Sequence, residues 1–313
     1  MILCGALPAM GADWVSERVH VEPRLPAPTT IPRSDFRAGA TVALINVTVR
    51  DRANHPVTGL EREDFRLFEN RVEQQIKYFA DEEAPVSIGV IFDASGSMGD
   101  KVGMAREAVA ELLKPANYDD EFFLIRISDR PDLATDFTNH GEEIQGRLLP
   151  VVSKGRTSLL DGIYLGLQQM KRARNQRKAL IVVSDGGDNH SRYSRAEVMN
   201  LTRESDVQIH AIGLFEPTPT REQPTATLKG PLLLAELAEE TGGRHVPVTK
   251  ISALPDIAQN IGSAIRRQYL LGYTPSDLSR DGKYRKVQVS IAPQRNQHAL
   301  RVDWKRGYYA PAQ

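Results

Sequence analysis

The middle of the chain alternates between short apolar runs and longer segments with helical spacing, and this alternation restricts the fold more than any other feature. From about residue 84 to residue 267, apolar runs such as "VSIGVIFD" and "KALIVVSDG" alternate with segments such as "TSLLDGIYLGLQQMKRAR". Strands that are apolar on both faces are typical of a parallel sheet covered by helices on both sides. The sequence therefore predicts a doubly wound, mostly parallel α/β domain over residues 84–267.

The segments on either side of this domain have a different character, with short strand patterns separated by turn residues. Residues 40–80 contain "TVALINVTVRD" and "FRLFENRVEQQIKYFA", and we expect the second of these to form two strands joined at Asn70-Arg71. Residues 268–310 contain "YLLGYTP", "KYRKVQV" and "LRVDW". Neither flank alone has enough strands to enclose a core. We therefore expect both flanks to form one small β-sandwich-like module into which the α/β domain is inserted.

The first 36 residues combine an apolar start, "MILCGALPAMGA", with a proline-rich, aperiodic continuation. The start resembles the end of a secretory signal peptide whose basic front part is missing, and the alternative interpretation is a frayed terminus. A signal peptide predicts a secreted, periplasmic or cell-surface protein, and the alternative is a cytoplasmic one. Because Cys4 is the single cysteine, an intramolecular disulfide framework is excluded.

The charge balance argues against two classes of partner. The 313 residues include 40 Lys and Arg and 40 Asp and Glu, so the formal net charge is zero. This balance gives no support for a nucleic-acid or anionic-membrane partner. After the first dozen residues, no segment approaches the roughly 18 apolar residues that span a bilayer. The oligomeric state does not follow from the sequence.

Two of the apolar strand patterns end in aspartate followed by small or polar residues. "VIFDASGS" puts Asp93 at the end of one strand, and "IVVSDGGDN" puts Asp185 at the end of another. A right-handed parallel topology brings both strand ends to one edge of the sheet, and the loop "KGRTSLLDG" can present Thr157 there. With the hydroxyls of Ser95 and Ser97, these groups are hard oxygen ligands. Such ligands suit Mg²⁺ or Mn²⁺ better than zinc.

This set of residues resembles the metal-ion-dependent adhesion site of von Willebrand factor type A domains. "DASGS", the threonine of "GRTSLLDG" and the aspartate of "SDGGDN" occur in the order of that family. The resemblance covers about residues 84–267, and the flanks look like those of bacterial VWFA-related proteins, which are typically exported. It implies a non-enzymatic adhesion module in which the cation binds a carboxylate of a partner protein. The implied metal ligands are Asp93, Ser95, Ser97, Thr157 and Asp185.

Four further residues are expected beside the metal or at the rim of the ligand site. Gly96 lets the loop turn tightly enough for both serines to face one centre. Asp161, in the first turn of its helix, is expected to accept hydrogen bonds that stabilise a loop, and Asp188 is either a solvated loop charge or an outer-shell group. His190 is either an ordinary surface histidine or a contact for the partner. Taken singly, the aspartates and hydroxyls of this region also fit helix caps and turns, but their joint pattern favours a metal site.

Two other functions stay open at this point. One is an envelope or intracellular assembly factor in which the metal is structural. The other is a Mg²⁺-dependent phosphotransfer enzyme with Asp93 as nucleophile, although Ser95 stands where such enzymes usually carry a second acid. The sequence has neither a G-x-S-x-G nucleophile motif nor a P-loop motif. The segment "FEPTPTREQPTATLKGP" is expected to be an exposed insertion at the same edge of the sheet, either a selectivity loop or a tolerated insertion.

Overall fold

The computed structural model describes residues 42–114, 116–215, 226–248, 250–293 and 300–312. The segment that resembles a signal peptide, Cys4 and most of the insertion that follows residue 215 lie outside these residues. No helix in the described part of the chain is both long and apolar enough to cross a bilayer.

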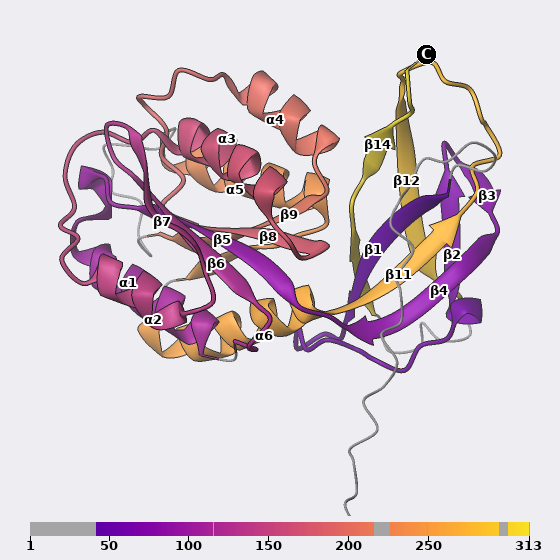
Figure 1. The fold of residues 1–313 in the computed structure, drawn as a ribbon, viewed down its shortest axis with the longest axis horizontal. Coiled ribbons are helices and arrows are strands. Elements are labelled where there is room, and N and C mark those ends of the chain that lie inside the picture. The colour runs from indigo at the N-terminus through magenta and orange to yellow at the C-terminus, as the bar shows by residue number, and fades with distance from the viewer. Residues whose placement is uncertain (1–41, 115, 216–225, 249, 294–299, 313) are drawn as a thin grey trace, which may run out of the picture. The chain divides into compact units, whose positions relative to one another are not determined.

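A six-stranded sheet forms the centre of the α/β domain (Figure 1), with the strand order β10-β9-β8-β5-β6-β7. The pairs among its first five strands are all parallel, and β7 pairs antiparallel with β6 at one edge. Every residue of β5 and β9 is buried, as expected for central strands covered on both faces. The strands are β5 (Val86–Asp93), β6 (Glu121–Ile127), β7 (Pro131–Thr138), β8 (Arg177–Ser184), β9 (Val207–Leu214) and β10 (His245–Val248).

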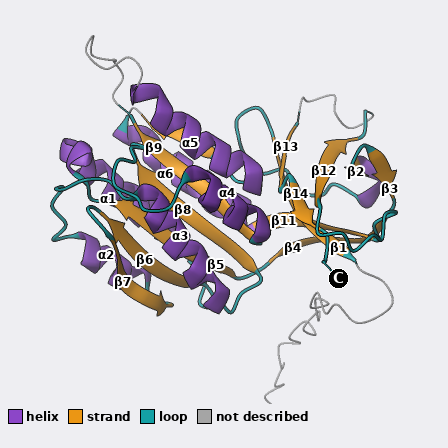
Figure 2. Ribbon diagram, turned by 90° about the horizontal axis from the view of Figure 1, so that it is seen from above, coloured by secondary structure: helices purple, strands orange, loops and turns teal. Residues whose placement is uncertain are grey.

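Helices cover both faces of this sheet, as Figure 2 shows from above. One apolar cluster joins the sheet to α1, α2 and α6, and a second joins its other face to α3, α4 and α5. The helices are α1 (Val102–Leu113), α2 (Gly141–Leu148), α3 (Leu159–Gln169), α4 (Arg195–Glu204), α5 (Ala226–Thr241) and α6 (Leu254–Arg266). Short 3-10 helices span Arg62–Asp64, Gly96–Lys101, Met170–Arg172 and Ile251–Ala253. The predicted doubly wound α/β architecture is confirmed.

The flanking segments form two four-stranded antiparallel sheets, each of which combines strands from both ends of the chain. Their strand orders are β13-β1-β11-β4 and β14-β12-β2-β3. A third apolar cluster lies between them, with Val47 and Leu271 from the first sheet and Leu67 and Val289 from the second. The strands are β1 (Ala43–Arg50), β2 (Phe65–Glu69), β3 (Val72–Gln74), β4 (Ile76–Glu83), β11 (Arg267–Tyr273), β12 (Tyr284–Ile291), β13 (Arg301–Trp304) and β14 (Gly307–Tyr309).

One predicted strand of the N-terminal flank is divided in the structure. The turn at Asn70-Arg71 is present, and both residues have positive φ, of 48° and 71°. The segment after this turn forms β3, which pairs with β2, and then β4, which pairs with β11 in the other sheet. The strand is divided because its two halves serve different sheets of the sandwich.

Candidate metal centre

The two strand-end aspartates lie on neighbouring strands at the point where the chain connections diverge. β5 pairs in parallel with β8 on one side and with β6 on the other, and Phe92 is aligned with Val183. This register puts Asp93 beside Ser184, one residue before Asp185. The connection after β5 runs through α1, whereas the connection that leads to β8 runs through α3, on the other face of the sheet. Ligand sites of doubly wound sheets lie at such switch points.

Asp93 is a buried carboxylate whose two oxygens both accept hydrogen bonds. Its Oδ1 accepts from the backbone N–H of Ser95 at 2.9 Å, and its Oδ2 accepts from the Ser184 hydroxyl at 2.5 Å. Burial raises the pKa of Asp93 to about 6; the nearby charge of Asp185 adds to this shift, and the hydrogen bonds from Ser184 and Ser95 oppose it. A cation placed here would therefore compensate a charge that the fold has taken out of water.

The loop after β5 holds the two serine hydroxyls together. Ser95 Oγ lies 3.1 Å from Ser97 Oγ, with Ser95 buried and Ser97 exposed. The backbone N–H of Gly96 donates to the Gly155 carbonyl at 3.0 Å, and a Cβ at Gly96 would stand only 3.2 Å from that oxygen. The N–H of Lys154 in turn donates to the Ala94 carbonyl at 2.9 Å. The loop that carries Thr157 is thereby fixed against the loop that carries the serines.

Thr157 and Asp185 approach the same region from two other loops. A Cβ built on Gly187 would lie 3.3 Å from Asp185 Oδ1 and 4.0 Å from Thr157 Oγ1, so both oxygens border one small space. Asn189 joins the two loops: its Oδ1 accepts from the N–H of Thr157, and its own N–H donates to the Thr157 carbonyl, both at 3.0 Å. The structure thus brings all five sequence-predicted residues to one edge of the sheet.

A lysine side chain lies against this group of oxygens. Lys101 Nζ donates to Asp185 Oδ2 at 3.1 Å, and both side chains are largely buried, with 19% and 14% exposed. Lys101 ends the 3-10 helix Gly96–Lys101 that follows the serine loop. A cationic group thus already neutralises the more accessible of the two carboxylates.

The four additional residues have distinct positions. Gly96 joins the two loops through the hydrogen bond from its backbone N–H to the Gly155 carbonyl. Asp161 Oδ1 accepts from the N–H groups of Arg192 and Tyr193, at 2.8 Å and 3.0 Å. Asp188 Oδ1 accepts from Leu160 N–H at 3.3 Å and from the Ser191 hydroxyl at 2.5 Å. His190 is exposed, and its Nδ1 lies 3.2 Å from Arg156 Nη1.

The donor set fits a small hard cation. It consists of two carboxylates and three hydroxyls, without imidazole or thiolate. Among the described residues, no three His, Cys, Asp or Glu side chains are grouped as in a conventional metal site. The hydroxyls must therefore supply ligands that in other sites come from a third acid.

Sequence reasoning did not identify Ser184, Asn189 or Lys101, which position or neutralise the predicted ligands.

Comparison with known proteins agrees with the fold of the central part of the chain. Residues 88–187 match the family model for the von Willebrand factor type A domain. This stretch contains all five predicted ligands and confirms the resemblance for the central part of the chain. A search of curated proteins found no match.

Solved structures with a similar fold include three from different sources. A von Willebrand factor type A protein from Catenulispora acidiphila is 12% identical, with a TM-score of 0.50, and the match covers 88% of this chain and 75% of that one. An aerotolerance-related membrane protein from Bacteroides fragilis is 16% identical over 57% of this chain and 98% of its own, with a TM-score of 0.49. Mussel byssus proximal thread matrix protein 1, with a zinc-occupied MIDAS motif, is 16% identical over 63% of this chain and 49% of its own, with a TM-score of 0.46.

Proposed function

We propose that this von Willebrand factor type A domain is a non-enzymatic, divalent-cation-dependent protein-binding module. Asp93, Ser95, Ser97, Thr157 and Asp185 hold the cation, and the cation in turn binds a carboxylate of a partner protein. The observation that carries this proposal is the convergence of three loops, which brings two carboxylates and three hydroxyls together. Mg²⁺ or Mn²⁺ is the expected cation because every donor is a hard oxygen.

The charge of the donor set leaves the cation attractive to an external anion. Three of the five donors are neutral hydroxyls, and the Asp93 carboxylate already accepts hydrogen bonds at both oxygens. A cation held mainly by hydroxyls and water keeps positive charge toward its open side. A glutamate or aspartate side chain of the partner then completes the coordination.

Two exposed apolar side chains precede the loop that carries Thr157, and they offer contact area for a protein partner. Leu149 and Val152 are 72% and 73% exposed, and they lie in or just before the loop that bonds to Ala94 through Lys154. Exposed apolar groups of this size are typical of protein-binding surfaces, so they suit an interface in which apolar contacts accompany one ionic contact. The partner is therefore expected to carry an acidic residue flanked by apolar ones.

The burial of Asp93 argues against the phosphotransfer alternative. A nucleophilic carboxylate must reach a phosphoryl group with one free oxygen. Asp93 is fully buried, and both of its oxygens are engaged by Ser95 and Ser184. This burial instead supports a role of the carboxylate in holding a cation or in ordering the serine loop. Export to the cell surface or periplasm stays a prediction from the first residues of the sequence.

Partner capture with and without the cation tests the proposal. The immobilised protein is incubated with extract in Mg²⁺ and in EDTA, in parallel with Asp185→Ala and with Asp206→Asn, an exposed control. We expect the wild type and Asp206→Asn to retain partner proteins in Mg²⁺ but not in EDTA. Asp185→Ala should not retain these proteins. Identical capture in Mg²⁺ and EDTA contradicts the proposal. Loss of the circular dichroism spectrum in EDTA would instead favour the assembly factor with a structural metal.

A further inference from the structure

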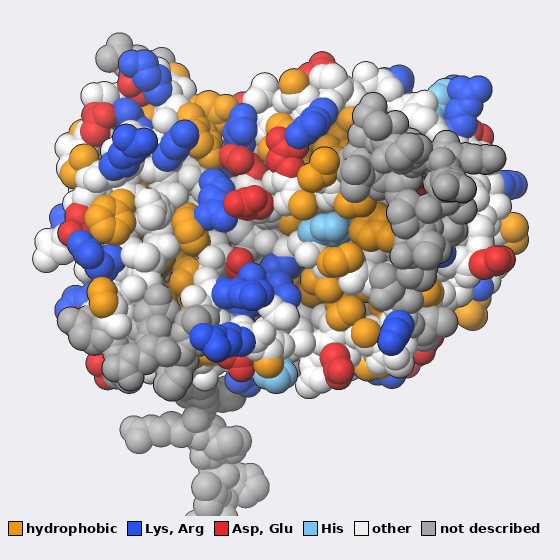
Figure 3. All heavy atoms as spheres, turned by 180° about the vertical axis from the view of Figure 1, so that it is seen from behind, with side chains coloured by type: hydrophobic (Ala, Val, Ile, Leu, Met, Phe, Trp, Pro, Cys, Tyr) orange, Lys and Arg blue, Asp and Glu red, His pale blue; other side chains and the backbone are white. Residues whose placement is uncertain are grey.

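A second site of interest lies away from the proposed metal centre, where the loop between α5 and β10 meets β1 and β13. A cavity of about 460 Å³ opens there, bordered by Arg50, Gly243, Arg244, Arg301 and Trp304 among others. Figure 3 shows lysine and arginine side chains gathered in the middle of one face of the molecule. The cavity contains none of the five proposed metal ligands.

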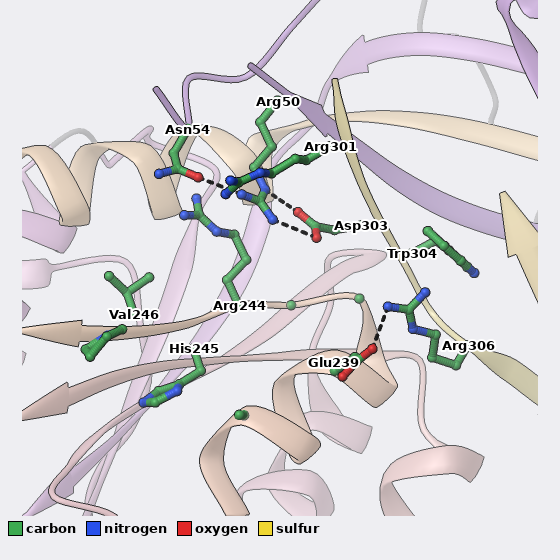
Figure 4. Close-up of a pocket in the computed structure, with 14 residues that line it drawn as sticks. Arg50, Asn54, Glu239, Arg244, His245, Val246, Arg301, Asp303, Trp304 and Arg306 are labelled. Atoms are coloured by element: carbon green, nitrogen blue, oxygen red, sulfur yellow. Dashed lines mark hydrogen bonds and ion pairs between the residues drawn. The ribbon is translucent and has the colours of Figure 1, made fainter. Parts of the chain in front are cut away.

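Three arginines of this cavity face a single carboxylate. Figure 4 shows Arg50, Arg244 and Arg301 directed toward the region between Asn54 and Asp303. Arg50 forms two hydrogen bonds with Asp303, one of them from Nη2 at 2.9 Å. Within the described part of the chain, neither Arg244 nor Arg301 forms an ion pair or a side-chain hydrogen bond. Asp303, which pairs with Arg50, also attracts Arg244. Among the described residues, these three arginines and one carboxylate therefore leave an excess of two positive charges in the cluster.

The fourth arginine of the cavity is already neutralised. Arg306 Nη2 donates to Glu239 at 2.9 Å, and its guanidinium lies over the Trp304 ring, 4.1 Å from the ring centroid. This pair leaves the positive charge of the cavity concentrated on the side of Arg244 and Arg301. Trp304 and Val246 add apolar wall to the same cavity.

Two glycines fix the backbone at the edge of the cavity. A Cβ at Gly242, where φ is +74°, would stand 2.4 Å from the backbone of Trp304, and a Cβ at Gly243 would stand 2.1 Å from the Ile209 carbonyl oxygen. The backbone N–H of Arg306 donates to the Glu240 carbonyl at 3.1 Å. The charged side chains are thus carried by closely packed backbone, which keeps their arrangement preorganised for a ligand.

The titration of two neighbouring groups agrees with an excess of positive charge. Burial, together with the charges of Arg50 and Arg301, lowers the pKa of Arg244 to about 10, and the charge of Asp303 opposes this shift. His210 lies on β9, the strand next to β10. Burial lowers its pKa to about 3, and the charges of Arg244 and Arg50 contribute.

We propose that this cavity binds a small dianionic ligand, carrying either a phosphate group or two carboxylates, through Arg50, Arg244 and Arg301. The excess of two positive charges matches a ligand charge of about −2, which a phosphate monoester approaches at neutral pH. The planar guanidinium fork donates two parallel hydrogen bonds to phosphate or carboxylate oxygens, which a lysine cannot do. We expect a small-molecule ligand, because a cavity of about 460 Å³ accommodates a small molecule and not a polymer.

Calorimetric titration of the full chain tests this proposal in a chloride buffer from which divalent cations have been removed with a chelating resin, so that its result is independent of the metal centre. The probes are inorganic phosphate in one arm and succinate in the other. We expect saturable binding of one anion per chain in at least one arm, and the arm that binds identifies the chemistry. Arg244→Gln and Arg301→Gln are each expected to weaken binding about tenfold or more, because each removes charge-assisted hydrogen bonds.

Arg280→Gln is the matched control, because Arg280 is an exposed arginine outside the cavity. It should bind the anion as the wild type does. Arg301 is itself exposed, so its substitution leaves the fold intact even if Arg244→Gln does not fold. Absence of saturable binding in both arms overturns the proposal. Wild-type affinity in the folded Arg301→Gln variant overturns it as well.

Discussion

At the scale of single residues, the predicted ligands were recognisable because most of them lie in short loops directly after apolar strands. Asp93, Ser95 and Ser97 occur within five positions, and Asp185 follows a second strand. Ser184 could have been predicted in the same way. In the parallel pair of β5 and β8, the residue before Asp185 lies beside Asp93. Lys101 has no such signal: its contact with Asp185 depends on how the 3-10 helix Gly96–Lys101 directs its long side chain.

Lys101 is expected to weaken cation binding, because its ammonium group competes with the metal for Asp185. Lys101→Met keeps most of the side chain's length and removes the charge. We expect its affinity for Mg²⁺ to rise about tenfold, since a like charge a few ångströms away costs on the order of 1–2 kcal/mol in a partly solvated site. Titration calorimetry of the variant measures this change. Lys171→Met, an exposed lysine on another element, should leave the affinity unchanged; unchanged or weaker binding by Lys101→Met would refute the competition.

His210 is expected to make the protein acid-sensitive. Its pKa is about 3 in the folded state, chiefly because of burial, whereas an exposed histidine in the unfolded chain has a pKa near 6.5. Below pH 6.5 the unfolded state therefore binds a proton that the folded state does not. The contribution to stability is present above pH 6.5 and is lost as the pH falls, by about 2 kcal/mol between pH 6.5 and 5.

Urea unfolding at pH 7 and pH 5 measures this effect of His210. The variant His210→Met should lose about 2 kcal/mol less of its unfolding free energy between the two pH values than the wild type does. The exposed His140 serves as the control, and His140→Gln should behave as the wild type. A pH dependence in His210→Met equal to that of the wild type contradicts the assignment.

At the scale of elements, strands and helices with strong apolar patterns were predicted and those with weak patterns were missed. β7 fully buries only one of its eight residues, because it is an edge strand, so the sequence shows no apolar run there. α2 has eight residues and only two buried ones, Ile144 and Leu148, so its helical spacing is barely visible. Both elements form because they pack against neighbouring elements: α2 packs against α1 and the sheet, and β7 pairs with β6.

The turn between α5 and β10 is expected to depend on Gly242. Alanine there must adopt a φ of +74° and meets the backbone of Trp304 at 2.4 Å, so Gly242→Ala should lower the unfolding free energy by roughly 2 kcal/mol or more. Gly103→Ala is the matched control, because no atom lies within 4 Å of its added Cβ. Since Gly103 is in α1, its change should instead stabilise the protein by up to about 1 kcal/mol. Equal thermal unfolding of both variants would contradict this account of the turn.

At the scale of the whole molecule, the sequence predicted that the flanks combine, because neither flank alone could enclose a core. The structure shows two sheets that each contain strands from both flanks. The division of β3 and β4 between these sheets was beyond sequence reasoning, since their segment is continuous and similar in pattern. The apolar clusters of the α/β domain and of the sandwich share no residue. The boundaries of the domains stay a prediction.

A fragment of residues 84–267 is therefore expected to fold alone. Both of its apolar clusters lie entirely within the fragment. It loses the contacts of α5 with Tyr284 and Arg306, so we expect it to be less stable than the full chain. Circular dichroism and thermal unfolding of the fragment measure this. An unfolded fragment, beside a folded full chain, would show that the sandwich is required for the α/β domain to fold.

The binding of a divalent cation by the five converging residues is the central claim, and calorimetric titration of the full chain with Mg²⁺ and Mn²⁺ tests it most directly. The wild type should bind one cation, and Asp93→Ala should lose that binding while keeping a native circular dichroism spectrum. Asp93→Ala should fold because it removes a buried carboxylate whose charge is destabilising without the metal. A wild type that binds neither ion, or an Asp93→Ala variant with unchanged affinity, would contradict the claim.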